Sequence, residues 1–297
     1  LYYFDFNELY KSIPFFATFF ILIFKIITSS LKILKDGMYV VNYAASLDRL
    51  INIYNSLINK RLHKNDKIKK IKFEKLKKNI IISNLNFSYG DKKIFQNANL
   101  IINKSDRILL SGPSGCGKST LIEIICGLIS NYQGEIKIDE VNLKNLNHNS
   151  WVKKIGYVGQ KNFLFNKSIK ENILDGAEDK NDNKNYKKII EVSGIKQFLS
   201  ESNLKDNLII NHTQDNLSGG QLRRISIARS LIKNPELIIL DEATNELDAQ
   251  LEEDILFNIK KFFSDITIII ISHKKTLSDF CNKKIKIENF MIKDTEC

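Results

Sequence analysis

The sequence predicts an α/β domain with a mostly parallel sheet over residues 80–297, preceded by apolar helices near the N-terminus. From residue 79 onward, short apolar runs alternate with helical patterns, as expected of a parallel sheet with crossover helices. Several of these runs are apolar throughout, which is typical of strands that are buried on both faces. The expected strands are residues 80–89, 106–112, 134–139, 154–159, 236–241, 265–272 and 283–288.

The positive charge of the chain is concentrated in one segment. The 297 residues include 45 Lys and Arg against 34 Asp and Glu, a net charge of +11. Residues 60–78 contain ten basic and two acidic residues and so carry +8 of this charge. A nucleic-acid-binding protein would spread its basic residues over a folded face with aromatics, so we expect no nucleic-acid partner. The four cysteines have no CxxC spacing, so neither a disulfide scaffold nor a zinc site is expected.

Two segments near the N-terminus have the composition of membrane-spanning helices. Residues 13–34 begin with an uninterrupted, mainly apolar run of 12 residues, and residues 38–60 have apolar residues at helical spacing. A spanning helix needs about 20 mostly apolar residues, whereas a buried helix of a soluble domain would also fit the shorter run. Asp36 and Gly37 predict a turn between the segments. We therefore expect two spans in a partial transmembrane domain of residues 1–62.

The basic segment follows the second expected span directly. Lys and Arg beside a membrane helix mark the cytoplasmic side and attract anionic lipid headgroups. A solvated charged linker would give the same pattern, and the two interpretations are compatible. Residues 63–79 are therefore expected to be a basic cytoplasmic linker, with membrane lipid as a partner. The chain starts at Leu1 instead of Met and shows no signal peptide, so we expect it to be part of a longer protein.

A glycine-rich loop predicts a phosphate-binding site. Residues 112–119 read GPSGCGKS, which matches GxxxxGK[ST] between an expected strand and an expected helix over 120–128. The glycines let backbone N–H groups turn towards phosphate oxygens, and the helix N-terminus adds its positive dipole end. Lys118 is expected to reach the β- and γ-phosphates, and the Ser119 hydroxyl to bind Mg²⁺. A chance glycine-rich turn would lack these two flanking elements.

Two acidic residues follow the apolar strand expected at 236–241. Asp241 lies at its carboxyl end, where it is expected to hold the Mg²⁺ shell beside the phosphate loop. Glu242 comes next and is placed to orient or deprotonate the attacking water. Two acids after a strand also fit charge complementarity at a helix N-terminus, but their combination with the phosphate loop favours the catalytic interpretation.

The remaining motifs identify a family. Residues 217–221 read LSGGQ and are followed by LRRISIARSL, which is the signature motif of ABC ATPases. Over about residues 80–297 the chain resembles the ATP-binding half of an exporter-type ABC transporter, and the whole ordered motif set is present. The resemblance implies a P-loop NTPase fold with an antiparallel β part and a helical signature subdomain. The signature motif would begin a helix over 218–233, in which Arg223 and Arg224 are expected to be structural or solvated.

The resemblance also assigns roles residue by residue. It implies catalytic roles for Gln160 of the glutamine loop, Glu242, and His273, the switch histidine after TIIIIS. The Mg²⁺ ligands would be Ser119, Gln160 and Asp241. The residues that contact ATP would be Tyr89, which stacks on adenine, Gly112, Ser114, Gly115, Cys116, Gly117, Lys118, Ser119, Thr120, Ser218, Gly220, Gln221 and Asp248 of the D-loop.

Three stretches depart from the family pattern. Residues 211–216 read NHTQDN, where exporters usually carry an acidic, glycine-containing stretch that contacts the membrane domain. Gly159 stands before the glutamine loop, where Pro or Ser is commoner. Asn245 and Glu246 replace the small residues usual in the D-loop. None of these departures removes a catalytic group.

Together these features predict a subunit of an exporter that couples ATP hydrolysis to transport. The resemblance implies a dimer with a second half-transporter, in which each signature motif faces the γ-phosphate held by the other subunit. Two spans cannot enclose a pathway, so four earlier spans are expected to precede residue 1. The N-terminal segment is most similar to flippases of lipid-linked oligosaccharides, which makes such a glycan the first candidate substrate. Peptide or bacteriocin, drug and lipid exporters remain alternatives.

The expected location is a bacterial inner membrane, crossed several times, with the ATPase domain in the cytoplasm. Two other classes fit parts of the sequence. A soluble ABC ATPase would require that the apolar N-terminus does not span a membrane, but such proteins lack a fused apolar span. A non-hydrolysing regulatory module is opposed by the intact set Lys118, Asp241, Glu242 and His273.

Overall fold

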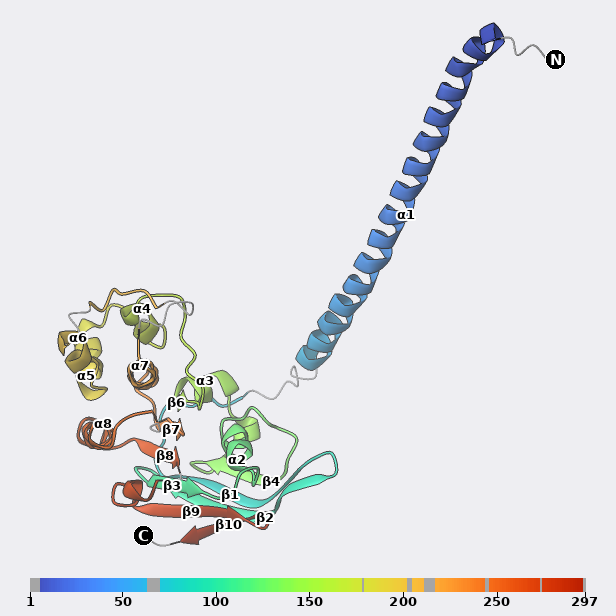
Figure 1. Ribbon diagram of the computed structural model, residues 1–297. Coiled ribbons are helices and arrows are strands. Elements are labelled where there is room, and N and C mark those ends of the chain that lie inside the picture. The colour runs from blue at the N-terminus through green and yellow to red at the C-terminus, as the bar shows by residue number, and fades with distance from the viewer. Residues whose placement is uncertain are drawn as a thin grey trace. The chain divides into compact units, whose positions relative to one another are not determined.

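The computed structural model describes residues 6–62, 70–177, 179–201, 205–210, 217–243, 246–272 and 274–295. The sequence predictions that fall on residues outside this set are His273, residues 211–216, Asn245 and the first part of the expected linker, residues 63–69. The chain divides into two compact units, residues 1–68 and 69–297. Figure 1 shows the first as the helix α1 and the second as an α/β body.

One continuous helix, α1 (Phe6–Leu62), forms the N-terminal unit. Its 57 residues correspond to about 86 Å of helix, against about 30 Å for the hydrocarbon core of a bilayer. The turn predicted at Asp36 and Gly37 is wrong, and the two expected helices are one. A single glycine costs a helix only about 1 kcal/mol, and helical apolar spacing continues on both sides of it. Gly37 therefore lies inside the helix.

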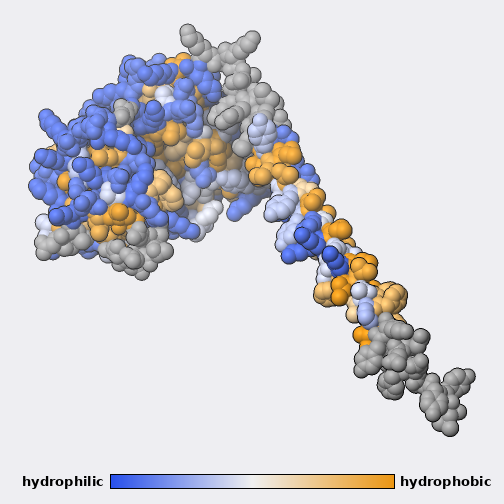
Figure 2. All heavy atoms as spheres, turned by 90° about the horizontal axis from the view of Figure 1, so that it is seen from above, coloured by the Kyte–Doolittle hydropathy of each residue, from blue (hydrophilic) through white to orange (hydrophobic). Residues whose placement is uncertain are grey.

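The described side chains of α1, residues 13–55, are all exposed. The stretch Ile13–Asn55 is long and apolar enough to cross a membrane, by length and composition. Figure 2 shows apolar side chains along this helix, interrupted by hydrophilic ones. The hydroxyls of Thr18 and Ser30 donate to carbonyls three and four residues earlier, at 2.8 and 2.9 Å. In the apolar core of a bilayer, polar groups need hydrogen-bond partners within the helix, and these two hydroxyls have them. Membrane insertion of α1 stays a prediction.

A six-stranded sheet forms the centre of the second unit, in the order β10-β9-β3-β8-β7-β6. Neighbouring strands run parallel except for β10, which pairs antiparallel with β9 at one edge. The predicted α/β class with a mostly parallel sheet is therefore confirmed. The bounds are β3 (Arg107–Ser111), β6 (Ile155–Val158), β7 (Leu237–Asp241), β8 (Thr267–Ile271), β9 (Lys283–Glu288) and β10 (Met291–Thr295).

Both faces of this sheet are buried, which explains the uninterrupted apolar runs. In β7, Leu237 and Ile239 belong to one hydrophobic core, whereas Ile238 and Leu240 belong to another. Successive strand side chains point to opposite faces, so a strand between two cores must be apolar at every position. Buried residues of α2 (Lys118–Ile125) and α3 (His148–Lys153) join the first core, and those of α7 (Gly219–Leu231) and α8 (Ala249–Phe262) join the second.

A second, antiparallel sheet has the order β2-β1-β4-β5. Its bounds are β1 (Asn79–Tyr89), β2 (Lys92–Asn103), β4 (Gln133–Ile138) and β5 (Val141–Asn142). The sequence did not predict β2, because its buried residues are separated by polar ones such as Gln96, Asn97 and Asn99. Pairing with β1 gives these alternating residues a buried and an exposed face.

The segment 70–78 belongs to the second unit, although a linker was predicted there. Phe73 and Leu76 are buried, and Phe73 packs edge-on against Trp151 with ring centres 4.8 Å apart. The backbone N–H of Leu76 donates to Glu236 at 3.3 Å. Apolar residues spaced between the lysines anchor the backbone, so the compact unit begins at about residue 69 and not at residue 80.

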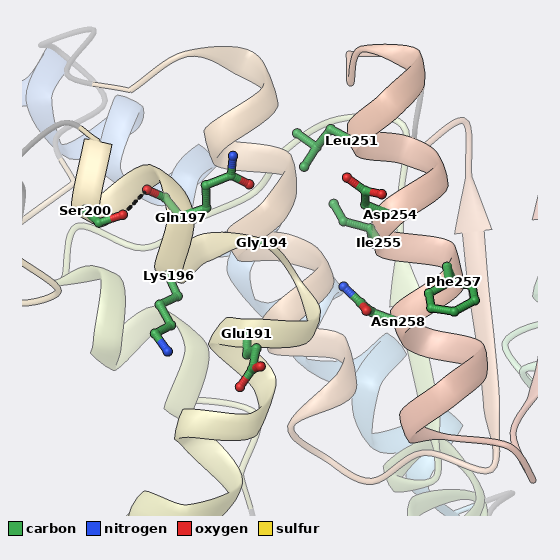
Figure 3. Close-up of a pocket in the computed structure, with 10 residues that line it drawn as sticks. All are labelled: Glu191, Gly194, Lys196, Gln197, Ser200, Leu251, Asp254, Ile255, Phe257 and Asn258. Atoms are coloured by element: carbon green, nitrogen blue, oxygen red, sulfur yellow. Dashed lines mark hydrogen bonds between the residues drawn. The ribbon is translucent and has the colours of Figure 1, made fainter.

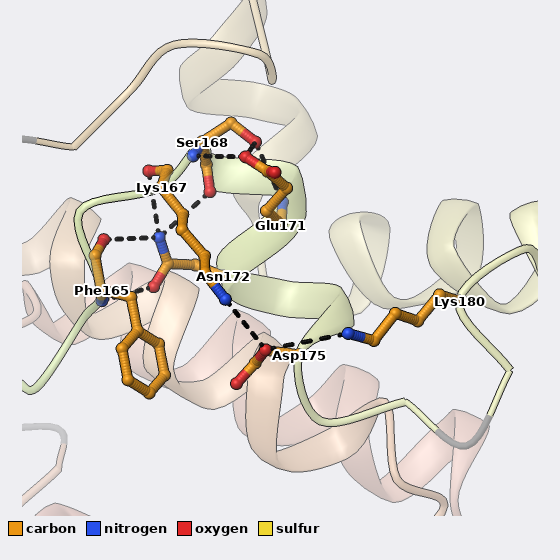
Figure 4. Close-up of polar contacts among 7 residues, drawn as sticks. All are labelled: Phe165, Lys167, Ser168, Glu171, Asn172, Asp175 and Lys180. Atoms are coloured by element: carbon orange, nitrogen blue, oxygen red, sulfur yellow. Dashed lines mark hydrogen bonds and ion pairs between the residues drawn. The ribbon is translucent and has the colours of Figure 1, made fainter.

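Helix α7 contacts α4 (Ile169–Leu174), α5 (Asn183–Val192) and α6 (Ile195–Glu201), and α5 also contacts α8 (Figure 1). The loop that leads from Gln160 into α4 is held by Asn172, whose side chain is fully buried. Its amide oxygen accepts from the N–H of Phe165 at 2.8 Å, and its amide nitrogen donates to the carbonyls of Phe165, Lys167 and Ser168 (Figure 4). These bonds tie the end of the loop, residues 165–168, to α4.

Candidate functional site

The phosphate loop joins β3 to α2. Gly112, Gly115 and Gly117 have φ angles of 149°, 76° and 108°, which favour glycine. A Cβ on Gly112 would lie 2.6 Å from the carbonyl oxygen of Ile287, and one on Gly117 would lie 2.6 Å from Ile94 Cγ2. Helix α2 begins at Lys118, two residues before the predicted start, so its N-terminus lies at the end of the loop. A loop with such turns followed by a helix start is a cradle for an anion.

Gly112→Ala is expected to destabilise the domain more than Gly115→Ala. Both residues have positive φ, which costs an L-residue about 1–2 kcal/mol. A Cβ added to Gly112 would also overlap with the carbonyl oxygen of Ile287, which would lie 2.6 Å away. No atom of the described residues lies within 4 Å of a Cβ added to Gly115. Urea denaturation should therefore give a lower free energy of unfolding for both variants and a clearly lower one for Gly112→Ala. Equal losses would contradict the predicted overlap.

A cavity of about 370 Å³ opens beside this loop. The Lys118 amine lies over the loop, donating to the carbonyls of Gly112 at 2.7 Å and Pro113 at 3.0 Å. The predicted site residues that line the cavity are Tyr89, Ser114, Gly115, Gly117, Lys118, Ser119, Thr120, Gln160, Asp241 and Glu242. Lys92, Ile94 and Ile271 also line it and were not predicted. Lys92 pairs with Tyr89 across the β1–β2 hairpin, so recognising β2 would have revealed it.

The two acidic residues are positioned by the end of β7. Glu242 has a φ of 51°, a left-handed conformation that is strained for a glutamate, and its N–H donates to the Ile271 carbonyl at 3.0 Å. Its carboxylate accepts a hydrogen bond from the Gln160 side-chain amide at 3.0 Å. Gln160 and Glu242, 82 residues apart in sequence, are thus in direct contact at the rim of the cavity.

Asp241 is half-buried and accepts a hydrogen bond from Tyr157. Burial raises the pKa of its carboxyl, and the hydrogen bond from the Tyr157 hydroxyl, at 3.1 Å, opposes that shift. A cation at this carboxylate would also favour its charged form. No group of three or more His, Cys, Asp or Glu with metal-ligand geometry occurs in the described part of the chain. A cation here would need phosphate oxygens and water as further ligands, which is typical of Mg²⁺.

Tyr89 ends β1 at the edge of the cavity. Its ring is half exposed and packs edge-on against Phe87, with ring centres 4.8 Å apart. Its hydroxyl donates to Glu123 of α2 at 3.3 Å. An exposed ring held by two neighbours offers a face on which a flat base could stack.

The signature residues start helix α7 and do not line the cavity. Ser218 caps the helix in a reciprocal pair with Gln221: the serine hydroxyl accepts from the Gln221 N–H at 3.3 Å, and the Gln221 side chain accepts from the Ser218 N–H at 2.9 Å. Asp248 caps α8 by accepting from the Leu251 N–H at 2.9 Å. Gly112, Cys116, Gly220 and Asp248 are also absent from the lining, and His273 lies outside the described residues.

A larger cavity, of about 440 Å³, lies between α8 and the α5–α6 pair (Figure 3). It is lined by residues such as Glu191, Lys196 and Asp254, and by no predicted site residue. It has neither the glycine loop nor the paired acids of the smaller cavity. Phosphate recognition needs converging backbone N–H groups, so the smaller cavity is the candidate nucleotide site.

Comparisons with known proteins show the family of the chain. The family model described as ABC transporter matches residues 95–245. The microcin-J25 export ATP-binding/permease protein McjD of Escherichia coli is 36% identical over 72% of this chain and 36% of its own length. A putative multidrug export ATP-binding/permease protein of Staphylococcus aureus is 35% identical over 73% of this chain and 38% of its own.

A solved structure of a bacterial Atm1-family ABC exporter with ATP bound matches with a TM-score of 0.70 and 26% identity. The match covers 76% of this chain and 40% of that one. This chain thus spans little more than a third of these curated relatives. The second unit has the fold of an ABC ATPase domain, and the matched residues include the phosphate loop and Glu242. The chain belongs to the ABC transporter family.

Proposed function

We propose that residues 69–297 bind and hydrolyse ATP to drive transport. The observation that carries this proposal is the convergence of the phosphate loop, Gln160, Asp241 and Glu242 on one cavity. Lys118 and the loop N–H groups would bind the phosphates, and the Tyr89 ring would stack on adenine. Glu242, oriented by the Gln160 amide, would accept a proton from the attacking water.

Mg²⁺ fits the oxygen donors of the same cavity. The Ser119 hydroxyl, the Asp241 carboxylate and the Gln160 side-chain oxygen would hold it. The ion, when bound, neutralises phosphate charge. Tyr157 keeps Asp241 in place through its hydroxyl, and this contact would fix the carboxylate that approaches the metal.

The proposed setting is a membrane exporter that works as a head-to-tail dimer. Helix α1 contains an apolar stretch suited to a bilayer, and the relatives include proteins described as exporters. Ser218, Gly220 and Gln221 would face the nucleotide of a second half-transporter, since they begin a helix away from the cavity of their own chain. We place the protein in a bacterial inner membrane, crossed several times, with the ATPase domain in the cytoplasm.

The proposed substrate is a lipid-linked glycan, on the resemblance of the N-terminal segment to flippases. Peptide export is the second candidate, because McjD, described as a microcin-J25 exporter, is 36% identical. The discriminating experiment uses the full-length protein in lipid nanodiscs, with ATPase activity measured against added lipid-linked oligosaccharide or peptide. Stimulation of the ATPase activity by only one of these two compounds would identify the substrate class. Recovery of the full-length protein in the soluble fraction without detergent would contradict the membrane setting.

A further inference from the structure

Arg223 of α7 reaches from the signature helix to the glutamine loop. Its side chain is 2% exposed. The guanidinium donates to the carbonyl of Gly159 at 2.6 Å and to the carbonyl of Gln160 at 2.8 Å. One planar group thus holds two consecutive backbone carbonyls. The backbone that it holds carries the Gln160 side chain, whose amide donates to Glu242.

Burial of the Arg223 guanidinium is unfavourable unless its charge has partners. Burial lowers the pKa of Arg223, and the negative charge of Glu246 opposes this shift. A guanidinium stays charged nonetheless, and two carbonyls with a carboxylate at 3.8 Å replace part of its lost hydration, while its Nε has no hydrogen-bond partner within the residues that the structure describes. Gly159 has no side chain to restrict its backbone, so the arginine supplies the restriction from outside.

Glu246 extends the contact to the D-loop. One carboxylate oxygen lies 3.8 Å from the Arg223 guanidinium, and the other accepts from the Asn162 side-chain amide at 2.9 Å. Arg223 and Glu246 therefore bracket the glutamine loop, holding it at Gly159, Gln160 and Asn162. Glu246 stands where the family usually has a small residue, so a side chain that could make this second contact is not typical of the family.

We propose that Arg223 is a positioning residue for ATP hydrolysis. It fixes the Gln160 backbone so that the side-chain amide meets Glu242, and it ties this position to the signature helix. The inference rests on the proposed ATPase function. Loss of the Arg223 side chain would leave the carbonyls of Gly159 and Gln160 without their donor and let Gln160 move away from Glu242. ATP binding depends on the phosphate loop and Tyr89, which Arg223 does not touch, so turnover should fall without a matching loss of affinity.

Arg224 provides a matched control on the same helix. Its guanidinium donates to the Gly194 carbonyl at 3.1 Å and lies over the Phe198 ring, with 4.8 Å to the ring centre. Burial lowers the pKa of both arginines, so their environments are comparable. Arg224 contacts the α5–α6 junction and not the glutamine loop, so Arg224→Gln reports the general cost of losing a buried arginine.

The experiment compares Arg223→Gln, Arg223→Lys and Arg224→Gln in the full-length protein in nanodiscs. For each variant, kcat and KM for ATP hydrolysis, the Kd of a fluorescent ATP analogue, and Tm are measured. Arg223→Gln should lower kcat about 10- to 100-fold, the effect of a displaced catalytic group, with Kd nearly unchanged. Arg223→Lys keeps the positive charge and can still donate to one of the two carbonyls. This variant should fold and show an intermediate kcat. Arg224→Gln should lower Tm and keep kcat near the wild-type value.

Three outcomes would overturn the inference. They are an unchanged kcat in both Arg223 variants, a loss of kcat in Arg224→Gln as large as in Arg223→Gln, and a loss of ATP affinity that accounts for the whole effect. If Arg223→Gln does not fold, the Arg223→Lys result decides. A wild-type protein that binds no nucleotide and hydrolyses no ATP would instead contradict the proposed function, and the inference with it.

Discussion

Glu242→Gln is expected to lower kcat for ATP hydrolysis about 10²- to 10⁴-fold while ATP still binds, the range for loss of a general base. The glutamine side chain has nearly the same shape but cannot accept the proton of the attacking water. Backbone geometry should persist, because the left-handed φ of 51° and the N–H bond to Ile271 do not involve the carboxylate. Nucleotide affinity should persist as well, since the phosphate loop is untouched.

Single-turnover and steady-state hydrolysis by the full-length protein would measure the effect, and size-exclusion chromatography with ATP would report the dimer. ATP that is bound but not cleaved should hold the two ATPase domains together, so the variant should remain in the closed state. Glu253→Gln, an exposed residue of α8, serves as control and should keep wild-type turnover. Undiminished steady-state hydrolysis by Glu242→Gln would remove Glu242 from its proposed role.

Lys118→Ala is expected to weaken ATP binding about 10- to 100-fold, because hydrogen bonds to charged groups contribute about 1.5–3 kcal/mol. The Lys118 amine now donates to the carbonyls of Gly112 and Pro113, so it already lies over the loop that would hold the phosphates. Its removal leaves the glycine cradle intact but takes away the only cation that both lines the cavity and belongs to the loop, among the residues described.

Equilibrium titration with a fluorescent ATP analogue would measure the change in Kd. Lys137→Ala is the matched control, because Lys137 lies on β4 in a partly exposed pair with Glu135 at 2.9 Å and does not line the cavity. Its Kd should equal that of the wild type. An unchanged affinity in Lys118→Ala would exclude the proposed phosphate contact.

Much of the site could be predicted because its motifs carry their own conformational requirements. The phosphate loop needs glycines at fixed positions, and these positions have the positive φ angles that the pattern implies. Asp241 and Glu242 follow an apolar run, and a parallel strand delivers the residues at its carboxyl end to the ligand-binding edge of the sheet. Patterns within a few residues therefore located the cavity and most of its lining.

Other features depended on contacts between distant residues. The Tyr157–Asp241 bond joins positions 84 residues apart, and the Arg223–Gly159 bond joins positions 64 apart. Arg223 was expected to be structural or solvated, and sequence alone gave no reason to distinguish it from Arg224. The difference lies in the loop that each guanidinium meets.

The sequence by itself determined the α/β class, the candidate nucleotide site and the family, because local periodicity and short motifs encode backbone conformations directly. The continuation of α1 through Gly37 is also local, because one glycine costs a long helix only about 1 kcal/mol, less than the turn signal suggested. Only the tertiary structure decided that Phe73 and Leu76 anchor the predicted linker to the ATPase unit, and that Arg223 holds the glutamine loop. Both outcomes depend on packing and hydrogen bonds between segments that are distant in sequence, whereas a charge run records only a local preference.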